Sequence, residues 1–241
     1  MITLYGRKPV LEILSDPDSS IYRLHLAASN QRGDAITRIK ELARKRNIET
    51  VTHPKEALSR ISKNARQDQG VAIDISPPNY RSIDDVKDCD GEILALDGIT
   101  NPQNLGMIIR SVAASPINGL LLPKKGCAKI DPLVHKASAG TLIKSRIYFC
   151  QTIESGLKSL RSSGYHIIGL SGNSEQQLAN LRNRNKKTAF VLGNETTGIR
   201  GSVLELCHEL ARIPLESGVE SINVAMAATI VAFRNTFNRS Q

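Results

Sequence analysis

Short apolar segments alternate with helical segments over residues 91–237, and this alternation restricts the possible folds more than any other feature of the sequence. Strands of this kind, when separated by helices, pair in parallel and are covered by helices on both faces. The sequence therefore predicts an α/β fold with a mostly parallel sheet. The expected strands are Ile93–Asp97, Gly119–Leu122, Ile147–Cys150, His166–Leu170, Ala189–Gly193 and Leu210–Ile213, and the expected helices are Asn104–Ala114, Pro132–Ala139, Ile153–Ser163, Val203–Cys207 and Val224–Phe237.

A smaller α/β region precedes this one, and the sequence Ser76-Pro77-Pro78-Asn79 separates the two. Two adjacent prolines continue neither a helix nor a central strand. We therefore predict a first domain over residues 1–76, a linker over 77–90 and a second domain over 91–241. The first domain is expected to contain helices at Pro9–Leu14 and Lys55–Ser62, a helix with Asp34 as its N-cap, and strands at Tyr22–Ala27, Glu49–Val51 and Val71–Ile75.

The charge of the chain favours a polyanionic partner. Lys and Arg number 32 against 23 Asp and Glu, which gives a net charge of +9. RNA or DNA is the simplest partner for such a chain. With four Phe, five Tyr and no Trp, a surface that binds single strands by base stacking is disfavoured. The helix after Asp34 has a basic face that is either solvated or contacts phosphate, made of Arg38, Lys40, Arg44, Lys45 and Arg46.

The cysteines and the apolar segments argue against other classes of protein. Cys89, Cys127, Cys150 and Cys207 form no CxxC pair, so we predict no metal site and no disulfide framework. Reduced cysteines are typical of the cytoplasm. No apolar run has the length of a membrane helix, and no secretory signal is recognisable at the start. We therefore expect a cytoplasmic protein.

Three motifs combine turn residues with polar side chains directly after expected strands, where open α/β sheets hold their ligands. They are motif 1 (residues 97–111), motif 2 (191–199) and motif 3 (213–228). Each has an ordinary structural explanation when taken alone: a surface ion pair for Arg110, a strand-to-helix loop for motif 2, and a helix N-cap for Ser221 or Asn223. No P-loop and no GxGxxG sequence is present, so conventional nucleotide sites are disfavoured.

The order of the motifs is more specific than any one of them. Asn-Pro-x-Asn-x-Gly-x-x-x-Arg, then Leu-Gly-Asn-Glu-x-x-Gly, then Ile-Pro-x-x-x-Gly-x-x-Ser-x-Asn-Val resemble motifs 1, 2 and 3 of the SpoU/TrmH branch of the SPOUT RNA 2′-O-ribose methyltransferases. The first domain opens with Tyr5-Gly6-Arg7-Lys8-Pro9-Val10-Leu11-Glu12 and closes with Gln69-Gly70-Val71-Ala72. It is similar to the ribosomal-protein-like RNA-binding domain of that family. The length is most similar to that of the 23S rRNA guanosine 2′-O-methyltransferases.

The resemblance implies a trefoil-knotted second domain, a homodimer with the final helix in its interface, and S-adenosylmethionine as cofactor. By motif, the implied cofactor-binding positions are Leu192, Gly193, Asn194, Ile213, Leu215 and Ile222. The implied catalytic set is Asn104, Arg110, Glu195, Ser221 and Asn223.

The chemistry of the implied reaction suggests a role for each catalytic group. A guanidinium stays protonated, so we expect Arg110 to clamp a phosphate and to acidify the ribose 2′-OH rather than to act as a base. Glu195, Ser221 and Asn223 would orient the ribose, Arg110 or the loops. Glu195 is the alternative proton acceptor.

The prediction is therefore an enzyme that methylates a ribose 2′-OH in rRNA, with a 23S rRNA guanosine as the first choice and tRNA as the second. A non-catalytic RNA-binding or ribosome-assembly protein of the same fold is the alternative from another class. The presence of all five implied catalytic residues argues against that alternative. A Rossmann-type small-molecule enzyme is disfavoured by the missing glycine fingerprint and by the basic charge.

Overall fold

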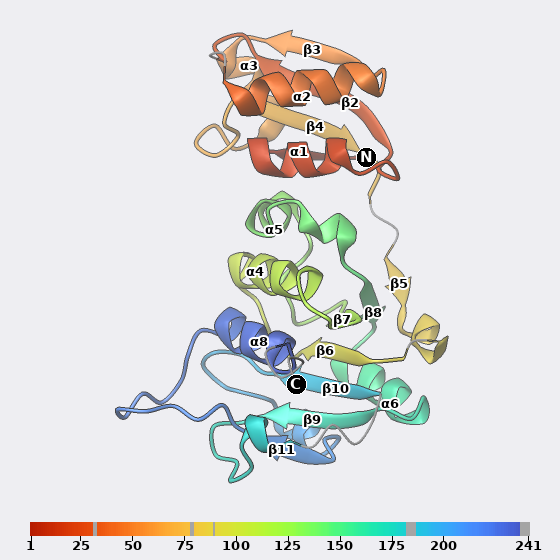
Figure 1. Ribbon diagram of the computed structural model, residues 1–241, viewed down its shortest axis with the longest axis vertical. Helices are drawn as coiled ribbons and strands as arrows, with labels where there is room; N and C mark the ends of the chain where they lie inside the picture. The colour runs from red at the N-terminus through yellow and green to blue at the C-terminus, as the bar shows by residue number, and fades with distance from the viewer. Residues whose placement is uncertain (31–32, 78–79, 89, 182–186, 237–241) are drawn as a thin grey trace. The chain divides into compact units, whose positions relative to one another are not determined.

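The computed structural model describes residues 1–30, 33–77, 80–88, 90–181 and 187–236, and the chain forms two compact units (Figure 1). The first unit comprises Met1–Asn79 with Ile130–Ile143, and the second comprises Tyr80–Lys129 with Lys144–Gln241. Within the described residues, no helix is long and apolar enough to cross a bilayer.

The first unit is built on a four-stranded sheet in the order β1-β4-β2-β3. β4 runs antiparallel to both of its neighbours, while β2 and β3 are parallel. Helices α1 and α2 pack on one face of the sheet, and Leu58 of α3 packs on the other. The elements are β1 (Ile2–Tyr5), α1 (Arg7–Ser15), β2 (Ile21–Ala27), α2 (Asp34–Lys45), β3 (Thr50–His53), α3 (Lys55–Ser62) and β4 (Val71–Ile75), joined by α5 (Pro132–Ala137) and most of η2 (Thr141–Lys144).

Helix α2 shows how its sequence pattern produces its packing. Ile36, Ile39 and Ala43 recur at helical spacing and are buried against the sheet. The prediction that Asp34 is the N-cap is wrong, because Gly33 occupies that position and no side chain caps the helix. Asp34 lies instead in the first turn, where a carboxylate interacts favourably with the helix dipole.

Arg46 is not part of an exposed basic face, although its position in the sequence groups it with one. Its guanidinium donates to the carbonyls of Ile13, Leu14 and Asp16 at 3.2, 3.2 and 2.7 Å. It also donates to Pro17 at 3.4 Å and to Ser19 at 2.6 Å. Two of these carbonyls, those of Ile13 and Leu14, lie in the last turn of α1, where a helix leaves carbonyls without its regular hydrogen bonds. Arg46 therefore fastens the end of α1 to the end of α2.

The second unit contains a seven-stranded sheet in the order β11-β9-β10-β6-β7-β8-β5, and every pair of neighbours is parallel among the described strands. This confirms the predicted α/β fold. The strands are β5 (Arg81–Ser82), β6 (Glu92–Leu96), β7 (Gly119–Pro123), β8 (Ile147–Cys150), β9 (His166–Leu170), β10 (Thr188–Leu192) and β11 (Glu209–Ala211); the helices are η1 (Ile83–Asp88), α4 (Pro102–Ala113), α6 (Ile153–Ser162), η3 (Leu178–Asn180), α7 (Gly201–Leu204) and α8 (Val224–Phe233).

The central strands are buried on both faces, as continuous apolar runs require. Ile93 and Ala95 of β6 belong to a core that also contains α6 and α7. Because side chains alternate along a strand, Leu94 and Leu96 point to the opposite face, and both are fully buried. Helices α4 and α8 lie side by side in this unit (Figure 1).

Several expected boundaries differ from those in the structure, and two of them differ most. Residues 80–88 lie within the expected linker, yet they form β5 and η1, and Val86 is fully buried in the core of the second unit. Helix α8 ends at Phe233, before the expected end at Phe237, which lies outside the described residues.

We predict that Arg46→Ala lowers the free energy of unfolding by about 3 kcal/mol, because several carbonyls lose a charged donor. Urea unfolding of the full chain measures this change. Lys45→Ala is the matched control: Lys45 is the exposed neighbour on the same helix, and its loss should change stability by less than about 0.5 kcal/mol. Equal effects of the two substitutions would contradict the fastening role of Arg46.

Candidate active site

The three motifs meet at one edge of the parallel sheet. β6, β7 and β8 extend the sheet in one direction, while β10 lies on the other side of β6, with β9 and β11 beyond it. Open parallel sheets bind their ligands beyond the carboxyl ends of the strands at such a change of direction. Motif 1 follows β6, motif 2 follows β10 and motif 3 follows β11.

An ion pair that the sequence analysis missed fixes motif 2 to the end of β6. Asp97 is 1% exposed, and its carboxylate accepts hydrogen bonds from the backbone N–H of Arg200 at 2.9 Å and from Arg200 Nε at 2.8 Å. Arg200 Nη2 lies 2.7 Å from the same carboxylate, and Nη1 lies 3.3 Å from Glu154. The side-chain hydrogen bond that Arg200 donates to Asp97 raises the pKa of the guanidinium. A buried carboxylate needs such partners, and here they determine where the loop lies.

Motif 2 forms a tight loop that requires glycine at one position. Asn194 and Gly198 exchange two backbone hydrogen bonds of 3.0 and 2.9 Å. A Cβ atom on Gly193 would lie 2.1 Å from the carbonyl carbon of Gly198, so no side chain fits there. The side chain of Asn194 bonds the protein through both of its polar atoms: Nδ2 donates to the Gly98 carbonyl at 2.8 Å, and Oδ1 accepts from Thr196 N–H at 2.8 Å. Asn194 thus holds the loop in shape.

A chain of side-chain hydrogen bonds joins all three motifs. Asn104 of motif 1 is 7% exposed, and its Nδ2 donates to Glu195 Oε1 of motif 2. Asn223 of motif 3 donates from Nδ2 to Asn104 Oδ1 at 3.1 Å. Asn223 Oδ1 in turn accepts from the backbone N–H of Ala225 at 2.8 Å, which caps helix α8. Three of the five implied catalytic residues are therefore in one network.

The other two implied catalytic residues are outside this network. Arg110 lies six residues after Asn104, on the exposed side of α4, and its guanidinium has no hydrogen bond or ion pair with a described residue. Ser221 is also exposed, and its hydroxyl has no partner within the described part of the chain. Both side chains are consequently available to a bound molecule.

Asn101 is a further residue whose role the sequence analysis missed. Its Oδ1 accepts from the backbone N–H groups of Gln103 at 2.8 Å and Asn104 at 3.4 Å, so it caps α4. With Pro102 at the first helical position, the Asn-Pro pair is a recognisable helix start. This cap sets the start of the helix and hence the position of Asn104.

The expected cofactor positions have the features that backbone recognition requires. Gly193, Ile213 and Ile222 are half-buried, and among the described residues their backbone groups form no hydrogen bond with the protein. Backbone N–H and C=O groups without a protein partner are available to a ligand with polar edges. Leu192 differs from these three residues, because its carbonyl already accepts a hydrogen bond from Asp97 N–H at 2.8 Å. Leu215 differs from them in its exposure, since 36% of its surface is accessible. The residues present fit a cofactor that is held mainly by backbone.

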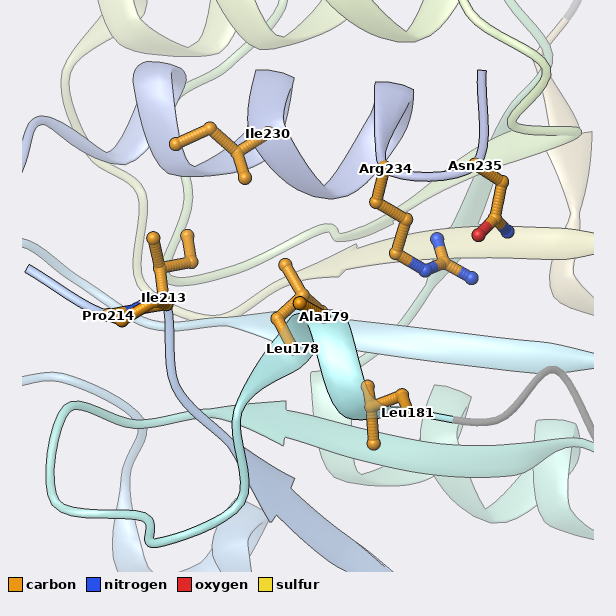
Figure 2. A pocket seen from close by; sticks show the side chains of 8 residues that line it. All are labelled: Leu178, Ala179, Leu181, Ile213, Pro214, Ile230, Arg234 and Asn235. Atoms are coloured by element: carbon orange, nitrogen blue, oxygen red, sulfur yellow. The ribbon is translucent and has the colours of Figure 1, made fainter. Parts of the chain in front are cut away.

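A cavity of about 300 Å³ lies between α8 and the segments that follow β9 and β11 (Figure 2). Ile213 is the one expected cofactor position that lines it. Arg234 lies at the polar end of the cavity and forms an ion pair with Glu92. The guanidinium of Arg234 stacks on the Phe190 ring, 4.1 Å from the ring centroid. The rest of the lining is mostly apolar: Leu178, Ala179, Leu181, Ile213, Pro214 and Ile230.

The three described cysteines have properties of structural residues. Burial raises the pKa of Cys127, that of Cys150 to about 12 and that of Cys207 to about 11. Thiols of this kind are protonated and unreactive at neutral pH. Chemistry at this site therefore depends on amide, carboxylate and guanidinium groups.

Family models match both parts of the chain. Residues 92–233 match the model described as the SpoU rRNA Methylase family, and residues 3–81 match that described as RNA 2'-O ribose methyltransferase substrate binding. A protein of Xylella fastidiosa called 23S rRNA (guanosine-2'-O-)-methyltransferase RlmB is 32% identical over 89% of this chain and 88% of its own length. An uncharacterized tRNA/rRNA methyltransferase of Mycobacterium sp. (strain KMS) is 30% identical over 94% and 73%.

Solved structures share the fold over the whole chain. An AdoMet-bound rRNA methyltransferase from Sinorhizobium meliloti has a TM-score of 0.80 at 20% identity and covers 100% of this chain and 88% of its own. The SpoU methyltransferase AviRb from Streptomyces viridochromogenes, also in complex with AdoMet, has a TM-score of 0.81 at 20% identity over 98% and 89%. These two likenesses establish the fold.

We predict that Gly193→Ala weakens the binding of S-adenosylmethionine, the cofactor that the motifs imply, by about tenfold or more, because the Cβ displaces the motif 2 loop. Gly201→Ala is the matched control, since a Cβ there meets nothing within 4 Å. Isothermal titration of each variant gives the affinities, and thermal unfolding checks the fold. An unchanged affinity in Gly193→Ala would show that the loop does not contribute to the cofactor site.

Proposed function

The chain belongs to the SpoU rRNA methylase family, and we propose that it transfers the methyl group of S-adenosylmethionine to a ribose 2′-OH of rRNA. That it is an S-adenosylmethionine-dependent RNA methyltransferase follows from the family. The observation that carries the proposal is the hydrogen-bond chain from Asn223 through Asn104 to Glu195, which assembles the three motifs into one site. In this proposal residues 1–76 bind the RNA and residues 91–241 carry the reaction.

The substrate class rests on the first unit and on one relative. The RlmB relative, whose name refers to a 23S rRNA guanosine, covers both parts of the chain. A solved structure described as "Structural insights into the 2-OH methylation of C/U34 on tRNA" covers 62% of this chain while 99% of its own is matched, with a TM-score of 0.53. It therefore has no counterpart to much of this chain. These comparisons favour a 23S rRNA guanosine, with tRNA as the second candidate.

The cofactor would be held by the free backbone groups of Gly193, Ile213 and Ile222, with Asn194 acting through the loop. Leu192 and Leu215 complete the set that the motifs imply. When bound, S-adenosylmethionine supplies a methyl group that its sulfonium already activates. The protein must therefore mainly position the ribose and stabilise charge on its oxygen.

We assign Arg110 as the group that binds a phosphate of the RNA. Its guanidinium is exposed and lacks a partner among the described residues, so it can bind a phosphate with two parallel hydrogen bonds. A fixed positive charge beside the ribose stabilises the 2′-oxyanion as it forms. Ser221, also exposed, would contact the ribose or the phosphate.

We assign Glu195 as the group that accepts the proton of the ribose 2′-OH. Asn104 holds one oxygen of its carboxylate, and the side chain is otherwise exposed. A carboxylate fixed in this way can accept the proton of the 2′-OH, which the permanently charged Arg110 cannot. Asn223 acts through Asn104 and is a positioning residue.

A homodimer is part of the proposal. Met107 of α4 is 42% exposed, and Met226 and Ile230 of α8 are 63% and 42% exposed. The two helices lie side by side, and Ser111 and Thr229 share a hydrogen bond of 2.7 Å between them. Exposed apolar side chains on adjacent helices favour association with a second copy. We also propose that the second unit is knotted and that the protein acts in the cytoplasm, where rRNA processing supplies its substrate.

The experiment that tests the proposed reaction supplies labelled S-adenosylmethionine with unmodified 23S rRNA and with unmodified tRNA in separate assays. Digestion of the labelled RNA to nucleosides identifies the product. Label in 2′-O-methylguanosine from 23S rRNA alone is the expected result. Label on a base would contradict ribose methylation, and label in tRNA alone would make the second candidate the substrate.

We predict that Arg110→Ala lowers the rate of methyl transfer by about 100-fold or more while leaving the affinity for S-adenosylmethionine unchanged, because the residue contacts RNA and not the cofactor. Single-turnover kinetics and isothermal titration measure the two quantities. Arg110→Lys, which keeps the charge but loses the planar fork, should fall between the two proteins. Loss of cofactor binding in Arg110→Ala would contradict the assigned position.

We predict that Met226→Glu converts the dimer to a monomer, because a carboxylate buried in the interface without a partner is costly. Light scattering coupled to size-exclusion chromatography gives the mass. Tyr22→Glu is the control, since Tyr22 is 54% exposed but lies in the first unit, and it should leave the dimer intact. A Met226→Glu protein that stays dimeric would exclude this face as the interface.

A further inference from the structure

The first unit contains a cavity of about 400 Å³ to which the proposed reaction gives no role. Residues from four places line it: the start of α1, the turn after β2, the start of α3, and the segment between α3 and β4. The whole lining belongs to the first unit, so the cavity exists without any contribution from the catalytic site.

The charge of this cavity is unbalanced. Arg7, Lys55 and Arg66 line it, and none of the three forms an ion pair with a described residue. The one acidic lining residue, Asp68, is 3% exposed and already accepts hydrogen bonds from Ser62 Oγ at 2.9 Å and from the backbone N–H of Gly70 at 2.9 Å. The lining therefore carries three cations against one carboxylate, a net charge of +2, and this excess attracts phosphate.

One wall of the cavity is held in an unusual backbone conformation. Gln69 and Gly70 have φ values of +54° and +75°. Gln69 Oε1 accepts from the backbone N–H of Arg7 at 2.8 Å, and Asn30 Nδ2 donates to the Gly70 carbonyl at 2.7 Å. A Cβ atom on Gly70 would lie 2.4 Å from Asn30 Oδ1, so this contact requires glycine. Backbone held in a costly conformation by its surroundings is typical of binding sites.

The same wall offers polar groups that the protein does not use. Asn30 Oδ1 accepts no hydrogen bond from a described residue, and Gln69 Nε2 donates none. An acceptor and a donor beside three cations complement the two parts of a nucleotide, since base edges carry donors and acceptors and the backbone carries negative charge.

We propose that this cavity binds one unpaired nucleotide of the RNA substrate, with its phosphate at Arg7, Lys55 and Arg66 and its base edge at Asn30 and Gln69. The inference rests on the proposed function, which makes RNA the polyanion that the first unit meets. Bound in this way, the nucleotide fixes the RNA on the enzyme at a point separate from the methylated ribose, so the cavity determines which RNA is selected.

The test measures binding of the full chain to unmodified 23S rRNA at several salt concentrations. Lys55→Ala and Arg66→Ala should each weaken binding about tenfold. Each should also reduce the slope of log affinity against log salt by about one, because one phosphate contact is lost. Arg60→Ala is the matched control: Arg60 is an exposed cation on α3 that does not line the cavity, and its loss should leave both quantities unchanged.

Gln69→Gly tests the contact with the base. Glycine adopts positive φ freely, so the fold should be kept, and thermal unfolding verifies this. Loss of the side-chain amide should weaken binding about fivefold without changing the salt slope, because no charge is removed.

The outcomes separate this proposal from the proposed reaction. Equal weakening by Arg60→Ala and Arg66→Ala would attribute binding to general surface charge and overturn the proposal. Unchanged binding in the cavity variants, or no binding of 23S rRNA by the wild-type chain, would also overturn it. A wild-type chain that methylates 23S rRNA while the cavity variants keep the same KM would exclude the cavity and leave the reaction intact. If the cavity variants lose binding but the wild type transfers no methyl group, the reaction fails and the cavity stands.

Discussion

The site depends on a short series of amide hydrogen bonds between loops that are far apart in the sequence. Asn223 caps α8 with its carbonyl oxygen and donates with its nitrogen to Asn104, which donates to Glu195. An amide side chain is suited to this because it carries both a donor and an acceptor. Of the three, Asn104 is buried, so removing either of its partners leaves a polar atom of this buried side chain without that hydrogen bond, and the three loops are therefore coupled through Asn104.

Two further constraints make that series possible. The buried carboxylate of Asp97 fixes the backbone and the side chain of Arg200, which brings the end of motif 2 to the end of β6. Gly193 then lets the loop return closely on itself, and the backbone groups of Gly193 form no hydrogen bond with a described residue. Parallel pairing of β6 with β10 aligns the carboxyl ends from which both motifs start. The strands thus hold the three loops in fixed positions, and in the proposed reaction these loops carry the catalytic side chains.

Much of this organisation is predictable from the sequence, and the remainder has physical reasons for being missed. Apolar runs such as Ile93–Asp97 indicate buried parallel strands, and the order of the motifs identifies the family. β5 contains two exposed residues and has no pattern to detect. Asp34 has the right residue type for an N-cap, but the helix begins one residue earlier than that pattern implies. The pairing of Asp97 with Arg200 spans 103 residues, and only the fold brings the two together.

The measurement that tests the account most directly is a double-mutant cycle on the amide series, read out by single-turnover methyl transfer to 23S rRNA. Asn104→Leu removes the central amide. Asn223→Ser keeps a side chain that can cap α8, but the shorter serine cannot form the hydrogen bond to Asn104. If the residues act as one unit, the double variant should be no more than about threefold slower than the slower single variant. Rate losses that multiply would show that Asn104 and Asn223 act independently, which would contradict the central claim.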